Sequence, residues 1–222
     1  MTGNTHFLKN KTLHIAMLVS AGAFIAVFMC CLDAPLTAWL RSLKQTGSLE
    51  FYSPLRPAVK FITHGAPLII AAIGLYVYGK FFDKKIMGIG KTLAIGFAAS
   101  GIAVQALKHL LGRARPRLGE TTVFIGPTLD INYDSFPSGH TTTAFCLAYL
   151  LARTFPKYTL LFYGFAVLTA FDRLMGLSHF PSDIIGGAVL GIGTGVLIYR
   201  SSLMKSNSAS LVNTDSSNHT AK

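Results

Sequence analysis

Six runs of mostly apolar residues, separated by short polar segments, dominate the hydrophobic pattern of the chain. They cover residues 13–32, 65–79, 92–111, 138–152, 158–171 and 184–199. A helix needs about 17 or more apolar residues to cross the hydrocarbon core, and polar interruptions are tolerated where helices pack together. The pattern therefore predicts an all-α integral membrane bundle of about six transmembrane helices, built from residues 1–200 as one membrane-embedded domain.

Two segments do not fit this pattern of spans. In the stretch DAPLTAWLRSLKQTGSLEFYSPLRPAVKF, apolar and basic residues alternate irregularly, and Trp39 lies close to Arg41. A helix lying in the membrane interface and a plain extramembrane loop both suit this stretch. Residues 201–222 are rich in Ser and Asn and have few apolar side chains to bury, so a disordered polar tail is expected there.

Composition supports a membrane protein. Hydrophobic residues make up 51% of the 222 residues and charged residues only 13%, and the mean hydropathy is +0.48. The net charge of +11 is scattered between the apolar runs, which indicates charges that orient helices and argues against a nucleic-acid partner. With the N-terminus inside, eleven of the 20 Lys and Arg residues fall in inner segments and nine in outer ones. This small bias supports an inside N-terminus only if several of the outer cations are set aside as ligand-binding residues.

Three polar clusters lie at ends of the predicted spans. The first is KHLLGRARPR, with Lys108 followed by Arg115 and Pro116; the second is PSGH at residues 137–140; the third is DRLMGLSHFPSD at residues 172–183. Counting spans places all three on the same side of the membrane. Ionisable groups at such positions are costly and tend to be functional.

The first predicted activity of these clusters is phosphate binding. Lys108, Arg115 and Arg173 supply three cations, and the guanidinium forks match pairs of phosphate oxygens. Ser138 and Gly139 open a predicted helix, whose N-terminus favours an anion, and glycine lets the backbone approach closely.

Two histidines could supply the chemistry. His179 and Asp183 are four residues apart, so the carboxylate could reach one imidazole nitrogen and leave the other free to attack phosphorus. His140, on another helix, could protonate the departing oxygen. Attack by His179 would form a phosphohistidine, which water would then hydrolyse.

Together these motifs resemble the three-part signature of the type 2 phosphatidic acid phosphatase superfamily, carried here by Lys108 with Arg115-Pro116, by PSGH, and by Arg173, His179 and Asp183. The resemblance spans about a third of the chain. It implies a six-helix, metal-independent membrane lipid phosphatase without a cofactor. It also implies His179 as nucleophile, Asp183 as its orienting partner and His140 as general acid, with the phosphoryl group held by Lys108, Arg115, Ser138, Gly139 and Arg173. One departure is Asp172, where the family often has serine; this acid could orient Arg173 or weaken phosphate binding.

The predicted function is hydrolysis of a phosphomonoester or diphosphate on a membrane lipid. Candidate substrates are undecaprenyl diphosphate, phosphatidylglycerophosphate, phosphatidic acid and lipid A phosphates. The predicted setting is a bacterial inner membrane, with the site facing the periplasm or cell exterior. A lipid phosphotransferase of the same fold and a non-enzymatic lipid-binding protein remain alternatives. The oligomeric state stays open.

Residues outside the signature have simpler interpretations. His64 and His109 are expected to be structural or interfacial. Arg113 and Arg117 could attract an anionic head group or lie in a solvated loop. The glycines of residues 186–195 indicate close helix packing, within the chain or in a dimer. The cysteines show no metal-ligand spacing and are expected to be buried thiols: Cys30, Cys31 and Cys146.

Overall fold

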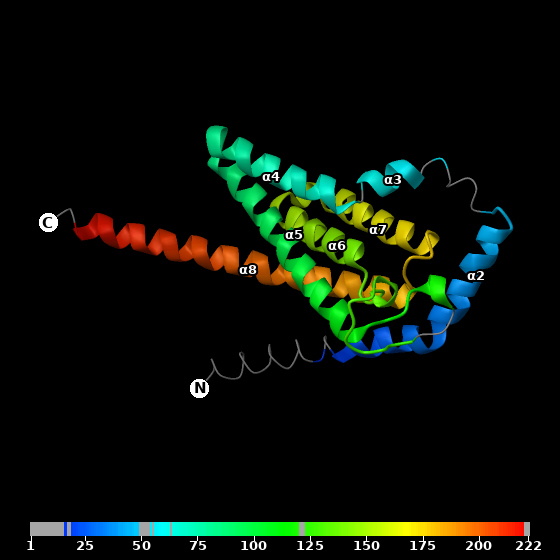
Figure 1. Cartoon of the computed structure of the whole chain (residues 1–222). Coiled ribbons are helices and arrows are strands. Elements are labelled where there is room, and N and C mark those ends of the chain that lie inside the picture. The colour runs from blue at the N-terminus through cyan, green and yellow to red at the C-terminus, as the bar shows by residue number, and fades with distance from the viewer. Residues whose placement is uncertain are drawn as a thin grey trace.

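The chain folds as a bundle of α-helices (Figure 1). The computed structural model describes residue 16 and residues 19–48, 54, 56–62, 64–119 and 123–219. Within these ranges there is no β-strand, only isolated bridges, so the predicted all-α class is confirmed. The main helices are α2 (Asp33–Gln45), α3 (Arg56–Ile62), α4 (Gly65–Phe82), α5 (Lys84–Leu111), α6 (Gly139–Thr154), α7 (Thr159–Met175) and α8 (Pro181–His219).

Among the residues that the structure describes, four helices are long and apolar enough to cross a membrane: Val19–Gln45, Gly65–Phe82, Lys84–Leu111 and Pro181–Ser202. Helices α6 and α7 form where two further spans are predicted, but they have only 16 and 17 residues. The membrane bundle is thus present, while a total of six spans stays a prediction. Residues 13–15, 17 and 18 of the first predicted span lie outside the described residues.

The segment from Asp33 to Gln45 is helical, which excludes a plain loop there. Helix α2 continues from a preceding helix through the π-helical turn η1 (Phe28–Leu32). Its buried residues are Asp33, Thr37 and Leu40, whose spacing places them on one face of the helix. Trp39 is 56% exposed on another face. The segment therefore has the amphipathic character expected of an interfacial helix.

Helix α6 lies at the centre of the bundle and packs against α5, α7 and α8. Glycines let α8 approach it closely. A Cβ atom at Gly191 would lie 2.2 Å from the backbone oxygen of Thr142, and one at Gly187 would lie 2.8 Å from that of Ser138. No real side chain tolerates such contacts, so these two glycines serve packing within the chain.

The loop between α5 and α6 lies at one end of the bundle, beside the start of α8 and next to α2 (Figure 1). It leaves α5 through Gly112, which has a φ of +60°, a conformation that glycine adopts without cost. The loop contains two short 3₁₀ helices, η3 (Pro116–Leu118) and η4 (Ile131–Tyr133). His109 anchors it, with Nδ1 3.0 Å from the backbone oxygen of Thr128, so the structural interpretation of His109 is confirmed.

Two further predictions concern the cysteines and the C-terminal segment. Cys146 is buried as predicted, but the prediction is wrong for Cys30 and Cys31, which are exposed on an apolar helix that could face lipid. Helix α8 continues to His219, through most of the segment for which a disordered tail is predicted, although its membrane-compatible part ends at Ser202. The division of the chain at residue 200 stays a prediction.

Candidate active site

A cavity of about 360 Å³ brings the three sequence motifs together. Six of the eight predicted site residues line it: Lys108, Arg115, Gly139, His140, Arg173 and His179. Ser138 and Asp183 are fully buried behind this lining. The cavity thus joins the end of α5, the start of α6, the end of α7 and the turn before α8.

His179 is held in one orientation through its Nδ1 atom. This atom lies 2.8 Å from the backbone oxygen of Ser135 and 3.5 Å from Oδ2 of Asp183. A carbonyl oxygen can only accept a hydrogen bond, so Nδ1 carries the proton and Nε2 is left with a free lone pair. The predicted contact with Asp183 is present, but the shorter contact is to the backbone of Ser135, which the sequence did not indicate.

Asp183 is fixed by several donors in addition to the histidine. Its Oδ2 accepts hydrogen bonds from the hydroxyl of Ser135 at 2.6 Å and from the backbone N–H of Phe180 at 2.8 Å. Its Oδ1 pairs with Nη1 of Arg113. A carboxylate with this many partners cannot rotate freely, so it can keep His179 in place.

Arg113 is completely buried and connects Asp183 to a second acid (exposed fraction 0%). Its Nη2 lies 2.6 Å from Oδ2 of Asp33 on α2. Asp33 also accepts a hydrogen bond from the backbone N–H of Ser182 at 2.9 Å. The guanidinium lies 4.5 Å from the ring centroid of Phe180. We call the three residues Asp33, Arg113 and Asp183 the buried ion network.

Both predictions made for Arg113, a head-group contact and a solvated loop position, are therefore wrong. The reason is its pairing with Asp33, which lies 80 residues earlier in the chain. The sequence contained one usable signal. Asp and Glu together number only nine, and one of them, Asp33, directly follows the first apolar run, where an acid without a partner would be costly.

Lys108 and Arg115 already share a carboxylate. Nζ of Lys108 lies 3.3 Å from Oδ2 of Asp134, and Nε of Arg115 lies 2.6 Å from Oδ1. Asp134 belongs to the loop before PSGH and also lines the cavity. We call this group the Asp134 cluster. The sequence did not predict this cluster, because Asp134 belongs to no motif. Its carboxylate nevertheless binds two cations that were predicted to bind phosphate.

Arg173 reaches the cavity from the end of α7. Its Nη2 pairs with the carboxylate of Asp172, so of the two effects predicted for Asp172, the orienting contact is present. The Nε atom of Arg173 is buried and has no hydrogen-bond partner within the described part of the chain. Buried donors of this kind favour an acceptor such as a phosphate oxygen.

The PSGH motif forms the start of α6. A Cβ atom at Gly139 would lie 4.0 Å from Nζ of Lys108, so the glycine and the lysine are neighbours in the cavity wall. The hydroxyl of Ser138 accepts a hydrogen bond from Thr141 at 2.9 Å. The ring centroid of His140 lies 5.9 Å from that of His64, whose Nδ1 caps α4 by accepting from the N–H of Ala66. The structural interpretation of His64 is thus confirmed.

Two pKa shifts describe the electrostatics outside the membrane spans. Burial lowers the pKa of His179 below its usual value of 6.5, and the opposing effect of Asp183 does not cancel it. Burial alone would raise the pKa of Asp134, but its hydrogen bond with Arg115 and the charge of Lys108 outweigh that effect and lower the pKa below 3.8. At neutral pH, His179 is therefore uncharged and Asp134 is ionised.

Comparison with known proteins identifies the family. Residues 89–206 match the PAP2 superfamily. The chain is 30% identical over 187 residues to the lipid A 1-phosphatase of Rhizobium etli, covering 75% of each chain. It is 28% identical over 136 residues to phosphatidylglycerophosphatase B of Bacillus subtilis, covering 56% of this chain and 61% of the relative. The protein belongs to the PAP2 superfamily.

A solved structure supports the same fold. The transmembrane PAP2-type phosphatidylglycerolphosphate phosphatase of Bacillus subtilis superposes with a TM-score of 0.62 at 20% sequence identity. The match covers 86% of this chain and 96% of that one. The predicted resemblance and the predicted helical phosphatase fold are thereby confirmed.

Proposed function

We propose that this protein hydrolyses the phosphomonoester or diphosphate of a membrane lipid through a phosphohistidine on His179. Membership of the PAP2 superfamily and the similarity to lipid A 1-phosphatase and phosphatidylglycerophosphatase B make it a phosphatase that acts on lipid phosphates. The reaction pathway, the roles of the residues and the class of lipid are our inferences.

The environment of His179 is the main support for this reaction pathway. Its Nδ1 proton is held by Ser135 and Asp183, and its free Nε2 belongs to a residue lining a cavity with three cations. In the first step, Nε2 attacks phosphorus, an N–P bond forms and the bond to the lipid oxygen breaks. His140 gives its proton to that oxygen.

The second step returns the enzyme to its starting state. His140, now neutral, takes a proton from a water molecule that attacks phosphorus, and the N–P bond breaks. Orthophosphate leaves, and Nε2 recovers its lone pair. Asp183 and the backbone oxygen of Ser135 keep the imidazole oriented through both steps, and the carboxylate stabilises the positive charge on the ring.

The cations stabilise the charge on the equatorial phosphate oxygens. Arg173 offers its buried Nε, and Lys108 and Arg115 offer the donors that now contact Asp134. A phosphate entering between Lys108 and Arg115 takes over these contacts from Asp134. Ser138 is assigned to the phosphate site through its hydroxyl, because its backbone N–H already donates to the backbone oxygen of Asp183 at 3.0 Å. The hydroxyl accepts from Thr141 and keeps its own proton to donate.

The cavity also offers a surface for lipid. Its wall includes four residues of two candidate spans that carry no polar side chain: Gly65, Leu68, Gly101 and Val104. Beyond His64 lies a second, apolar cavity of about 740 Å³ between α3 and α4, lined by Phe61 and Ile70 among others. A lipid tail in this apolar region places its phosphate beside His140, so lateral entry from the bilayer fits the arrangement.

We place the protein in a bacterial inner membrane, with the cavity facing the periplasm. The candidate substrates are undecaprenyl diphosphate, phosphatidylglycerophosphate, phosphatidic acid and lipid A phosphates. Leu129, 83% exposed in the loop at the cavity end of the bundle, provides a test of orientation. In a variant with Cys30, Cys31 and Cys146 changed to Ser, Leu129→Cys should react with a membrane-impermeant maleimide added from the periplasmic side. Reaction only after lysis of the inner membrane would reverse the orientation.

The function is tested by phosphate release from a panel of lipid phosphates and diphosphates, using detergent-purified protein with excess chelator. We expect release by the wild type and none by His179→Ala. Transfer of labelled phosphate to a lipid acceptor instead of water would indicate a phosphotransferase. Binding of lipid without turnover would indicate a lipid-binding protein.

A further inference from the structure

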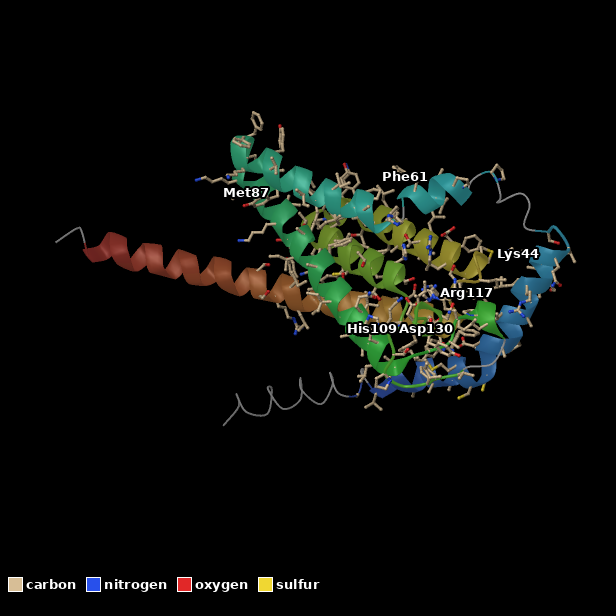
Figure 2. The ribbon with its side chains drawn as sticks, in the orientation of Figure 1. Lys44, Phe61, Met87, His109, Arg117 and Asp130 are labelled. Atoms are coloured by element: carbon tan, nitrogen blue, oxygen red, sulfur yellow. The ribbon has the colours of Figure 1, made fainter. Side chains whose placement is uncertain are left out.

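A second polar cavity, of about 440 Å³, lies beside the candidate active site. It shares Arg115 and Ser178 with the first cavity and adds cations from α2 and from the loop after α5. We call it the basic pocket; its residues with polar side chains are Arg41, Lys44, Arg115, Arg117 and Ser178. Lys44 and Arg117 lie at the same end of the bundle, opposite the end that carries Met87 (Figure 2).

The guanidinium group of Arg115 pairs with Asp134, whereas those of Arg41 and Arg117 each donate to a neutral acceptor. Nη2 of Arg41 donates to the backbone oxygen of Pro116 at 2.9 Å. Nη2 of Arg117 donates to the side-chain oxygen of Asn132 at 2.9 Å. In the described part of the chain, no carboxylate pairs with Lys44 or Arg117. The pocket thus contains oriented donors and an excess of positive charge, a combination that favours a multivalent oxyanion.

The pocket lies away from the apolar side of the site. His140, which donates the proton to the leaving oxygen, contacts His64 and through it the apolar cavity at α3 and α4. The basic pocket instead adjoins Ser178, the residue before His179, and Arg115. On the proposed function, the lipid leaves on the His140 side, so the basic pocket faces the phosphate and not the tail.

We propose that the basic pocket is a second phosphate-binding site, separate from the one at His179 and connected to it through Arg115. Two sources of its ligand share this chemistry: released orthophosphate, and a second phosphate on the substrate head group. Arg115 lines both cavities, so it can pass a phosphate from the reaction centre to the pocket or hold two phosphates of one ligand at once.

The site is tested by measuring the binding of orthophosphate to detergent-purified protein with titration calorimetry at low ionic strength. The wild type should show two binding events. Lys44→Gln/Arg117→Gln, which changes two residues of the pocket that do not line the active-site cavity, should abolish one event or weaken it about fivefold or more. Arg117→Lys combined with wild-type Lys44 keeps the charge and should retain both events.

The control is Lys84→Gln/Lys85→Gln. It removes the same charge from two exposed residues at the start of α5, near Met87 at the opposite end of the bundle (Figure 2), and should leave both events unchanged. A single event in the wild type, or the same weakening in the control, would overturn the proposal.

Kinetics distinguish the two sources. If the pocket takes released orthophosphate, Lys44→Gln/Arg117→Gln should weaken product inhibition with every lipid. If it takes a second head-group phosphate, the variant should raise KM for a lipid diphosphate and leave KM for a lipid monophosphate unchanged. Calorimetry needs no turnover, so a wild type that binds two phosphates but hydrolyses no lipid phosphate would refute the proposed function and not the second site.

Discussion

The buried ion network and the Asp134 cluster both pair acids with basic residues of the first motif region, but they differ in exposure. Arg113, Asp33 and Asp183 have no exposed side-chain surface. In the Asp134 cluster the side chains of Arg115 and Asp134 are 18% and 22% exposed. A buried charge cannot exchange its partner for water, whereas a charge at a cavity wall can exchange its partner for a ligand. We propose that the first group fixes His179 in place and that the second can exchange its carboxylate for a phosphate.

The largest expected effect comes from breaking the buried ion network. Arg113→Met leaves Asp33 and Asp183 buried without their shared cation. We expect a loss of about 3–5 kcal/mol in the free energy of unfolding, measured by denaturant or thermal unfolding in detergent. Arg117→Met, four residues away and exposed, serves as the control and should change stability by less than about 0.5 kcal/mol. Equal effects of the two substitutions would refute the distinction between the two arginines.

Removing the charge that orients the nucleophile should mainly affect turnover. Asp183→Asn keeps the size of the side chain but removes its charge. We expect kcat to fall about 100-fold, with a smaller change in KM, because the substitution acts on His179 and not on the phosphate ligands. Stopped assays of phosphate release at saturating lipid measure this. If kcat stayed within a few-fold of the wild type, Asp183 would not be a positioning residue.

Removing the acid of the Asp134 cluster should strengthen the binding of phosphate instead of weakening function. Asp134→Asn removes the carboxylate that competes with phosphate for Lys108 and Arg115. Inhibition by orthophosphate or vanadate should become stronger by about fivefold. The matched control is Asp130→Asn, an exposed acid in the same loop that caps η4. Weaker inhibition in Asp134→Asn would show that the carboxylate holds the cations in place for phosphate instead of competing with it.

The smallest expected effect is on the pH dependence of kcat/KM, which should depend on His179 and not on Asp134. Nucleophilic attack needs neutral His179, which predominates above its pKa, so kcat/KM falls as the pH drops through that value. Because burial lowers the pKa of His179, the acidic midpoint should lie below pH 6.5. Asp134, whose pKa is also lowered, stays ionised across this range, so Asp134→Asn should leave the midpoint unchanged. A midpoint above pH 6.5 would contradict the buried, neutral state of His179.

Much of the site could be predicted because its residues follow helix ends. Lys108 ends one apolar run, PSGH opens the next, and Arg173 and His179 connect two more. Helices that cross a membrane return such ends to the same face, so motif spacing was enough to bring six of the eight residues to one cavity. The helical class followed from the length of the apolar runs.

The remaining features depend on contacts between distant parts of the chain. The pairing of Arg113 with Asp33 joins residues 80 positions apart, and no local pattern shows which acid a buried arginine will meet. The backbone oxygen of Ser135 that orients His179 could not be foreseen, because side-chain patterns do not report where a loop carbonyl points.

A rapid-quench experiment can detect the proposed phosphorylation of His179. Detergent-purified protein would be mixed with a ³²P-labelled lipid phosphate on which it is active, quenched in base within the first turnover, and digested for peptide mapping. We expect a base-stable, acid-labile phosphoryl group on the peptide that contains His179, and none in His179→Ala. Hydrolysis at the wild-type rate with no label on that peptide, or label on His140, would contradict it.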